Sequence, residues 1–370
     1  MLLLICAIVT ALFSAFAARF RRNGTDVSDL AIGLIVAALM TLLVIVVLVL
    51  SIGLDVFGIL HLLYLQLVVA FPIAAAFLVI PHLLDREFRT PFLAYVVGIA
   101  AVVLALTGYW ATHVEPFNLK VDRQALGASG VDRPVMIGVI ADLQADHISD
   151  YERSAVEKVL EAEPDIVLLP GDLYQLDEED FPVRAPEFVG LLRQLTEAVD
   201  HVVIVEGHAD DPEGVGSIAE DAGALFLQDE IVDLDVGGQV ITIVGVTVPV
   251  DDSSSEIDPL IAEQLSANYD SDDLVILLTH RPDPVLLIEP GSPIDLTIAG
   301  HTHGGQVSIP GIGPLVRFTD VPRTVAAGGL HLLNGHAIYV STGVGIERDQ
   351  APQVRFRVRP SVGVITIVPS

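Results

Sequence analysis

The sequence predicts an α/β protein in two parts. Residues 1–113 are expected to form a bundle of about four transmembrane helices, and residues 134–370 a layered α/β domain, with residues 114–133 as a linker and first strand. The chain is 52% hydrophobic, which is high for one soluble domain, and its long uncharged apolar segments all lie before residue 113. Beyond that point, β-branched apolar runs alternate with amphipathic stretches of helix length, as in layered α/β folds.

Four apolar segments are candidates for membrane helices, because ~20 apolar residues suffice to span a bilayer. They are residues 1–18, 30–54, 56–80 and 91–112. The first segment has a second interpretation, as a cleaved signal peptide that would leave three spans. It lacks the basic region that precedes the apolar core of such a peptide, because its arginines follow the segment instead. We therefore favour four spans, with the lipid bilayer as a partner.

The positive charges predict the orientation of this bundle. Arg19, Arg21 and Arg22 follow the first segment, and Arg86 and Arg89 follow the third, whereas the turn after the second segment carries only an aspartate. By the positive-inside rule, the first and third loops are cytoplasmic. The sequence therefore predicts a multi-pass protein of the cell membrane whose C-terminal domain lies outside the cytoplasm.

The C-terminal part carries all of the net charge. Residues 1–113 hold five acidic and five basic side chains, so the formal net charge of −29 falls on residues 114–370. Such a surface repels nucleic acid at low salt, and no nucleic-acid partner is expected. A high-salt habitat would screen this charge, since the Debye length falls to ~3 Å at 1 M salt, and solubility alone is an equal explanation. The one cysteine, Cys6, excludes an intrachain disulfide.

The α/β domain is read from its apolar runs, which we expect to be strands covered on both faces. In order they are residues 118–123, 135–141, 166–170, 202–205, 240–246, 274–279, 294–299, 337–341 and 362–368. Helices are expected between several of them, at residues 151–162, 185–199, 216–224 and 258–265. Residues 251–256 read as a polar, serine-rich surface loop.

Polar side chains with metal-binding chemistry follow five of these runs. Ligands bind at the carboxyl ends of strands in such sheets, so residues at these positions are expected to converge. The candidates are Asp142 and Gln144, Asp172, His208 with Asp210, His280, and finally His301 and His303 on a glycine-rich turn. Any one alone is more often a turn residue or a satisfied polar group, but their recurrence at five strand ends favours a metal centre.

These motifs resemble those of the calcineurin-like metallophosphoesterase superfamily, and most closely its membrane-attached bacterial and archaeal branch. The family pattern is Asp-x-His, Gly-Asp, Gly-Asn-His-Asp/Glu, a lone His and then Gly-His-x-His. The similar stretches are residues 169–173 (LPGDL), 278–283 (LTHRPD), 300–306 (GHTHGGQ), 307–315 (VSIPGIGPL) and 339–345 (YVSTGVG). The resemblance covers residues 134–370 and implies an α/β/β/α sandwich.

The resemblance also implies two divalent ions, which would activate a hydroxide for attack on a phosphoester. Asp172 would bridge the ions. Asp142, Gln144 and His303 would hold the first, and His208, His280 and His301 the second. Mixed oxygen and imidazole ligands suit Mn, Fe or Zn. Asp172, His208 and Asp210 are then the expected catalytic positions.

Two positions depart from the family pattern. Gln144 stands where histidine is usual, and its amide oxygen can serve as a weaker, harder ligand. In the third motif, aligning Gly207 puts His208 at the asparagine ligand position and Ala209 at the catalytic histidine position. The rival register puts His208 on the catalytic histidine and loses a ligand; we favour the first because it also keeps Asp210 in place. Alanine cannot donate a proton, so substrates with good leaving groups are expected.

The sequence thus predicts a membrane-anchored, metal-dependent phosphoesterase acting on phosphomonoester, phosphodiester or diphosphate bonds, with a substrate that could be lipid-linked. The alternative is a catalytically impaired binding or sensing domain that keeps the metals but has lost the proton donor. A transporter is disfavoured, because the expected spans lack charged residues.

Overall fold

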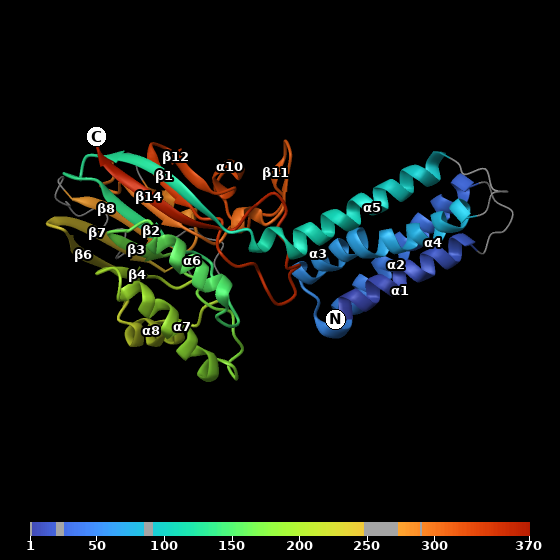
Figure 1. The fold of residues 1–370 in the computed structure, drawn as a ribbon, viewed down its shortest axis with the longest axis horizontal. Helices are drawn as coiled ribbons and strands as arrows, with labels where there is room; N and C mark the ends of the chain where they lie inside the picture. The colour runs from blue at the N-terminus through green and yellow to red at the C-terminus, as the bar shows by residue number, and fades with distance from the viewer. Residues whose placement is uncertain (1, 20–25, 85–91, 248–272, 289–290) are drawn as a thin grey trace. The chain divides into compact units, whose positions relative to one another are not determined.

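The computed structural model describes residues 2–19, 26–84, 92–247, 273–288 and 291–370 (Figure 1). The chain divides into two compact units. The helical unit comprises Met1–Val114 together with Glu347–Gln353, and the sheet unit comprises Glu115–Ile346 and Val354–Ser370. The expected helix at 258–265 and the expected loop at 251–256 lie outside the described residues.

The helical unit consists of long apolar helices. They are α1 (Leu2–Arg19), α2 (Asp26–Ile52), α3 (Val56–Leu65), the π-helical turn η1 (Gln66–Ala70), α4 (Phe71–Leu84) and α5 (Phe92–His113). The hydroxyl of Tyr64 donates to Gly108 O at 3.1 Å, which joins α3 to α5. A Cβ on Gly108 would lie 2.6 Å from Val68 Cβ, so only glycine allows η1 and α5 to approach so closely.

The expectation of four transmembrane helices requires correction. Among the described residues, two helices are long and apolar enough to cross a membrane by length and composition, Val56–Phe77 and Tyr95–Phe117. The two other apolar stretches, Leu2–Leu12 and Ala38–Ile52, are shorter and lie within α1 and α2. Four of the five arginines that predict the orientation lie outside the described residues: Arg21, Arg22, Arg86 and Arg89.

The sheet unit contains two six-stranded sheets and a small hairpin of β10 (Ser308–Ile309) and β11 (Gly313–Pro314) (Figure 1). In spatial order, sheet 1 is β1 (Lys120–Ala128), β14 (Ser361–Pro369), β2 (Val135–Val139), β3 (Ile166–Leu169), β4 (Val202–Ile204) and β5 (Leu225–Phe226). Sheet 2 is β12 (Gly329–Leu333), β13 (His336–Val340), β9 (Leu296–Ala299), β8 (Leu274–Thr279), β7 (Gln239–Val246) and β6 (Glu230–Val236).

The cores of this unit lie in layers. One cluster of buried side chains, including Ile137, Leu168, Ile276 and Ile298, comes from both sheets and fills the space between them. A second cluster packs helices α6 (Asp150–Leu160), α7 (Phe181–Thr196) and α8 (Pro212–Ala222) on sheet 1. A third covers the other face of sheet 2, with the short helices η3 (Asp283–Leu287) and α10 (Arg323–Ala326). The α/β prediction is confirmed.

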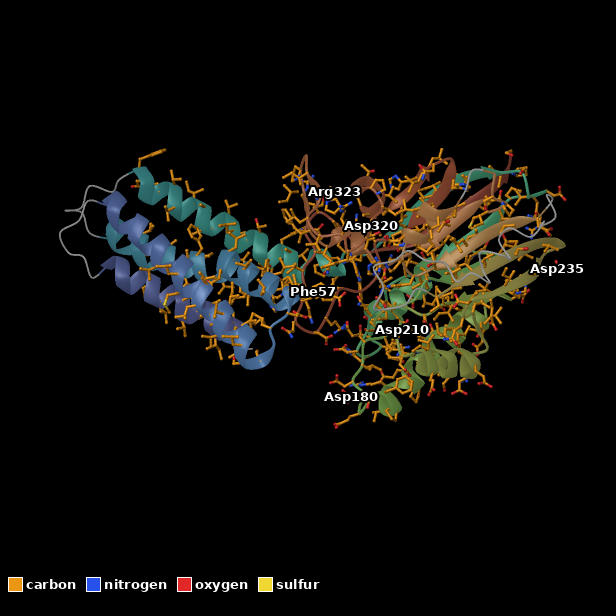
Figure 2. All side chains as sticks on the ribbon, turned by 180° about the vertical axis from the view of Figure 1, so that it is seen from behind. Phe57, Asp180, Asp210, Asp235, Asp320 and Arg323 are labelled. Carbon is orange, nitrogen blue, oxygen red and sulfur yellow. The ribbon has the colours of Figure 1, made fainter. Side chains whose placement is uncertain are left out.

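The strand directions decide where the polar strand ends meet. In sheet 1, β2, β3 and β4 are parallel, and in sheet 2, β7, β8, β9 and β13 are parallel. Each set therefore ends at one edge of its sheet. Figure 2 shows Asp210 and Asp320, which lie in loops, toward one end of the sheet unit, and Asp235, near the β6–β7 turn, at the other.

Sequence reasoning missed the short or edge strands β5, β6, β10, β11 and β12. Three of them, β5, β10 and β11, have only two residues, which is too few to show an alternating pattern. In β6, three exposed acidic residues interrupt the buried or partly buried apolar ones, so the strand is not a continuous apolar run. Such strands form because a neighbouring strand is already in place, which no local pattern records.

Candidate metal centre

The loops after five strands bring two groups of metal-binding side chains together. The first group is Asp142, Asp172 and His303, and the second is His208, His280 and His301. Within each group the candidate ligand atoms lie within 4.8 Å of one another. Asp142 and Asp172 follow β2 and β3, His208 follows β4, and the other three histidines follow β8 and β9. Both sheets therefore contribute to the same site.

The two groups touch through His280. Its Nε2 lies 3.5 Å from Asp172 Oδ2, and its Nδ1 lies 3.9 Å from Asp142 Oδ1. The rings of His208, His280 and His301 pack against one another with centroid separations of 4.7–5.1 Å. Asp172 thus lies where one carboxylate is close to ligands of both groups.

Backbone hydrogen bonds hold these loops in register. The amides of Asp142 and Gln144 donate to the carbonyls of Gly171 and Asp172, at 3.1 and 2.8 Å. The carboxylates are held in turn, because His301 N donates to Asp142 Oδ1 at 2.7 Å and Ala209 N donates to Asp172 Oδ1 at 2.8 Å. Each loop end therefore orients a side chain contributed by another loop.

The backbone is strained at most of the candidate ligands. Asp142, Gln144, Asp172, His301 and His303 all adopt positive φ angles, between 41° and 69°. This left-handed region is uncommon for residues other than glycine and costs of order 1–3 kcal/mol each when the surroundings impose it. Its recurrence at five residues of one site points to a geometry that serves function rather than stability.

The imidazoles present unprotonated nitrogens to the site. His280 Nδ1 lies 2.9 Å from Pro170 O and His301 Nε2 lies 3.0 Å from Phe318 O, so each ring donates its proton outward to a carbonyl. Three buried nitrogens, His208 Nδ1, His280 Nε2 and His303 Nε2, have no hydrogen-bond partner among the described residues. Buried polar atoms are normally paired, so these lone pairs fit a divalent cation.

Burial controls the ionisation of the site. It lowers the pKa of His280 to about 4, and burial together with the neighbouring His280 lowers the pKa of His301 to about 3. The pKa of His208 falls to about 2 for the same reasons. Burial raises the pKa of Asp172 to about 6, against the opposing effect of the hydrogen bond from Ala209 N. The histidines are therefore neutral at physiological pH.

Asp210, expected to be catalytic, is held by the backbone. Its Oδ1 accepts from Leu173 N at 2.8 Å and from Tyr174 N at 3.2 Å, and its Oδ2 accepts from Gly207 N at 2.9 Å. Burial and the charge of Asp172 raise the pKa of Asp210 to about 8. Its carboxylate joins the loops after β3 and β4, which makes it a support for Asp172 and His208.

Gly207 has to be glycine in this arrangement. A Cβ at this position would overlap with both the Oδ1 and the backbone nitrogen of Asp172. Any side chain would therefore displace the central carboxylate.

Gln144, the expected amide ligand, is buried with 1% of its surface exposed, two residues after Asp142.

Arg355 belongs to this region and was missed by sequence reasoning. It is fully buried, with Nη2 3.3 Å from His303 Nδ1, and burial lowers its pKa to about 10. It lies in an irregular segment between β13 and β14, so the strand-end pattern could not find it. The apolar neighbours Val354 and Phe356 are the one local signal of its burial.

Residues 135–305 match the model of one protein family, described as calcineurin-like phosphoesterase. Three curated relatives are similar over most of their length. An uncharacterized metallophosphoesterase of Bacillus subtilis, YkuE, is 27% identical over 72% of this chain and 92% of its own. The phosphodiesterase YaeI of Escherichia coli is 27% identical over 73% and 96%, and the B. subtilis metallophosphoesterase YkoQ is 25% identical over 59% and 80%.

Proposed function

Because the chain carries a calcineurin-like metallophosphoesterase domain, we propose that it is a metal-dependent phosphoesterase acting on phosphodiester or diphosphate bonds. The observation that carries the proposal is the pair of ligand groups that meet at Asp172 and His280. Oxygen and imidazole donors in this mixture suit Mn, Fe or Zn.

Two divalent ions fit the two groups. Asp142, Gln144 and His303 would hold one ion, and His208, His280 and His301 the other, with Asp172 shared between them. When bound, such ions neutralise phosphoryl charge and lower the pKa of water. The chain's own contribution is to keep three imidazoles neutral and to hold Asp172 through the amide of Ala209.

The third motif bears on which substrates are used. His208 packs against His280 and His301, which supports the register in which it is a ligand and Ala209 replaces the catalytic histidine. The backbone amide of Ala209 donates to Asp172, but its methyl side chain cannot donate a proton. The leaving group must therefore depart without a proton from this residue, which favours aryl esters and diphosphates over alkyl esters.

Membrane anchoring is part of the proposal. Val56–Phe77 and Tyr95–Phe117 have the length and composition of spans, and they precede the phosphoesterase domain. An anchored enzyme outside the cytoplasm would meet phosphoesters of the envelope, including lipid-linked ones. The second candidate function is a metal-stabilised binding or sensing domain, and the observation that favours it is Ala209 at the proton-donor position.

The full chain, purified in detergent, is expected to hydrolyse bis-p-nitrophenyl phosphate only with a divalent ion such as Mn²⁺. Chelation should abolish the activity and added Mn²⁺ should restore it, both at low salt and at 1 M salt, where charge repulsion from the acidic surface is screened. Folded protein that binds Mn²⁺ and hydrolyses neither aryl esters nor diphosphates would favour the sensing domain.

Metal affinity is expected to be about tenfold weaker at pH 5 than at pH 7.5. With the pKa of Asp172 at about 6, the free carboxyl is protonated at pH 5 and the cation must displace that proton, at about tenfold per pH unit. The histidines do not compete, because their pKa values lie at about 4 or below. Calorimetric Mn²⁺ titrations at several pH values measure this. A decline that begins near pH 7 and releases several protons would contradict it.

A further inference from the structure

Arg355 has a fully buried guanidinium whose Nε and Nη2 donate to one loop, whereas its Nη1 has no hydrogen-bond partner among the described residues. Its Nε lies 3.2 Å from Gly345 O, and its Nη2 donates to Gly345 O and, at 3.2 Å, to Gly343 O. A buried arginine without paired acceptors is strongly destabilising, so these carbonyls are necessary partners. The charges of Asp142 and Glu115 act favourably on it.

The loop that Arg355 holds is packed on Asp142. Gly345 N donates to Asp142 O at 2.7 Å, and Val344 N donates to Ala141 O at 3.0 Å. A Cβ on Gly343 would lie 2.8 Å from Asp142 Oδ2 and 3.1 Å from His303 Nδ1. The Gly343–Gly345 backbone therefore packs directly against the side chains of Asp142 and His303, and Arg355 holds this backbone in place through its carbonyls.

His303 shares an acceptor with Arg355. The ring has a hydrogen bond with the Gly345 backbone, and because Gly345 N already donates to Asp142 O, the acceptor is Gly345 O. The donor is Nδ1, since His303 Nε2 has no hydrogen-bond partner among the described residues. A proton on Nδ1 leaves the lone pair on Nε2, which is the tautomer that a metal ligand needs.

We propose that Arg355 is a positioning residue for the first metal: by clamping the carbonyls of Gly343 and Gly345 it sets the position of Asp142 and the tautomer of His303. The inference rests on the proposed metal site. The opposite arrangement predicts the opposite effect. Arg355 Nη2 also lies 3.3 Å from His303 Nδ1. If Arg355 donated across this contact, the proton of the ring would sit on Nε2, and removing Arg355 would strengthen metal binding.

The test is Mn²⁺ binding to the full chain, measured by calorimetry and by the electron paramagnetic resonance of the coupled ion pair. Arg355→Met is expected to weaken the binding of one of the two Mn²⁺ ions by about 10–100-fold, as loss of an outer support of a ligand typically does. The resonance signal of the coupled ion pair should then be replaced by that of isolated Mn²⁺. Arg355→Lys keeps a positive charge and hydrogen-bond donors but loses the planar guanidinium that can contact two carbonyls at once. Its Mn²⁺ affinity should lie between those of Arg355→Met and the wild type.

Arg357 supplies the matched control, because it is only two residues away and less buried than Arg355. Arg357→Met and Arg357→Lys should bind Mn²⁺ as the wild type does. Two ions bound with wild-type or higher affinity by Arg355→Met would overturn the inference, and so would unchanged affinity in Arg355→Lys if the Met variant does not fold. A wild-type chain that binds no Mn²⁺ would instead count against the proposed function.

Discussion

Replacing Asp172 with asparagine is expected to lower Mn²⁺-dependent hydrolysis of bis-p-nitrophenyl phosphate by more than about 100-fold. Loss of an outer support typically costs about 10–100-fold, and a carboxylate close to both ligand groups should cost more. Asparagine keeps an oxygen that can accept from Ala209 N, so the loop after β4 retains its hydrogen bond. What it removes is the negative charge of the carboxylate that lies close to both ligand groups. Initial rates and Mn²⁺ stoichiometry measure the effect.

Without metal at pH 7.5, Asp172→Asn should be at least as stable to unfolding as the wild type. Burial raises the pKa of Asp172 from 3.8 to about 6. The stability that this group contributes is present below pH 3.8 and lost as the pH rises through 6, so at pH 7.5 the buried charge is a cost that asparagine removes. Asp180→Asn, at an exposed position in the loop before α7 (Figure 2), is the control for rates and melting temperature. Wild-type activity in Asp172→Asn would contradict the proposed centre.

Introducing histidine at Ala209 is expected to raise hydrolysis of an alkyl phosphodiester, such as glycerophosphoethanolamine, by about 10²–10⁴-fold. A positioned general acid contributes a factor of this size when the leaving group is a strong base. Ala209 is adjacent to His208 in the chain, and its amide contacts Asp172, so a side chain here starts from the metal-binding groups. Bis-p-nitrophenyl phosphate should gain far less, because nitrophenolate departs without protonation.

Ala209→Gln is the matched control, since it adds a polar side chain of similar size that cannot act as an acid. The comparison of kcat/KM for the alkyl and aryl esters separates acid catalysis from a general improvement of the site. Equal gains in the histidine and glutamine variants, or equal gains on both esters, would contradict the assignment of Ala209 to the proton-donor position. An inactive wild type whose Ala209→His variant is active would favour the sensing function for the natural chain.

Much of the sheet unit could be predicted from the sequence, because its strands are buried on both faces. All six residues of β8 and all four of β9 are buried, and such runs stand out as continuous apolar stretches. Parallel strands end at a common edge, so the sequence predicts that the polar residues after each run converge there. The roles of the individual ligands stay predictions, although the structure brings six of them into two groups.

The helical unit was predicted less well. Apolar composition identifies segments that can be buried either in lipid or in protein, and it does not distinguish these two environments. Among the described residues, two of the four expected spans are candidates by length and composition. Local amphipathic patterns likewise placed α6, α7 and α8 but gave no signal for two-residue strands.

The sequence by itself determined the layered α/β class, the acidic character of the C-terminal part and the residue types at the strand ends, because each depends on local composition and period. Only the tertiary structure decided which nitrogen of each histidine faces the site, that Asp210 joins two loops, and that Arg355 lies behind Asp142 and His303. These features depend on hydrogen bonds between residues far apart in the chain, such as the 110 positions between Pro170 and His280, and no local pattern encodes them.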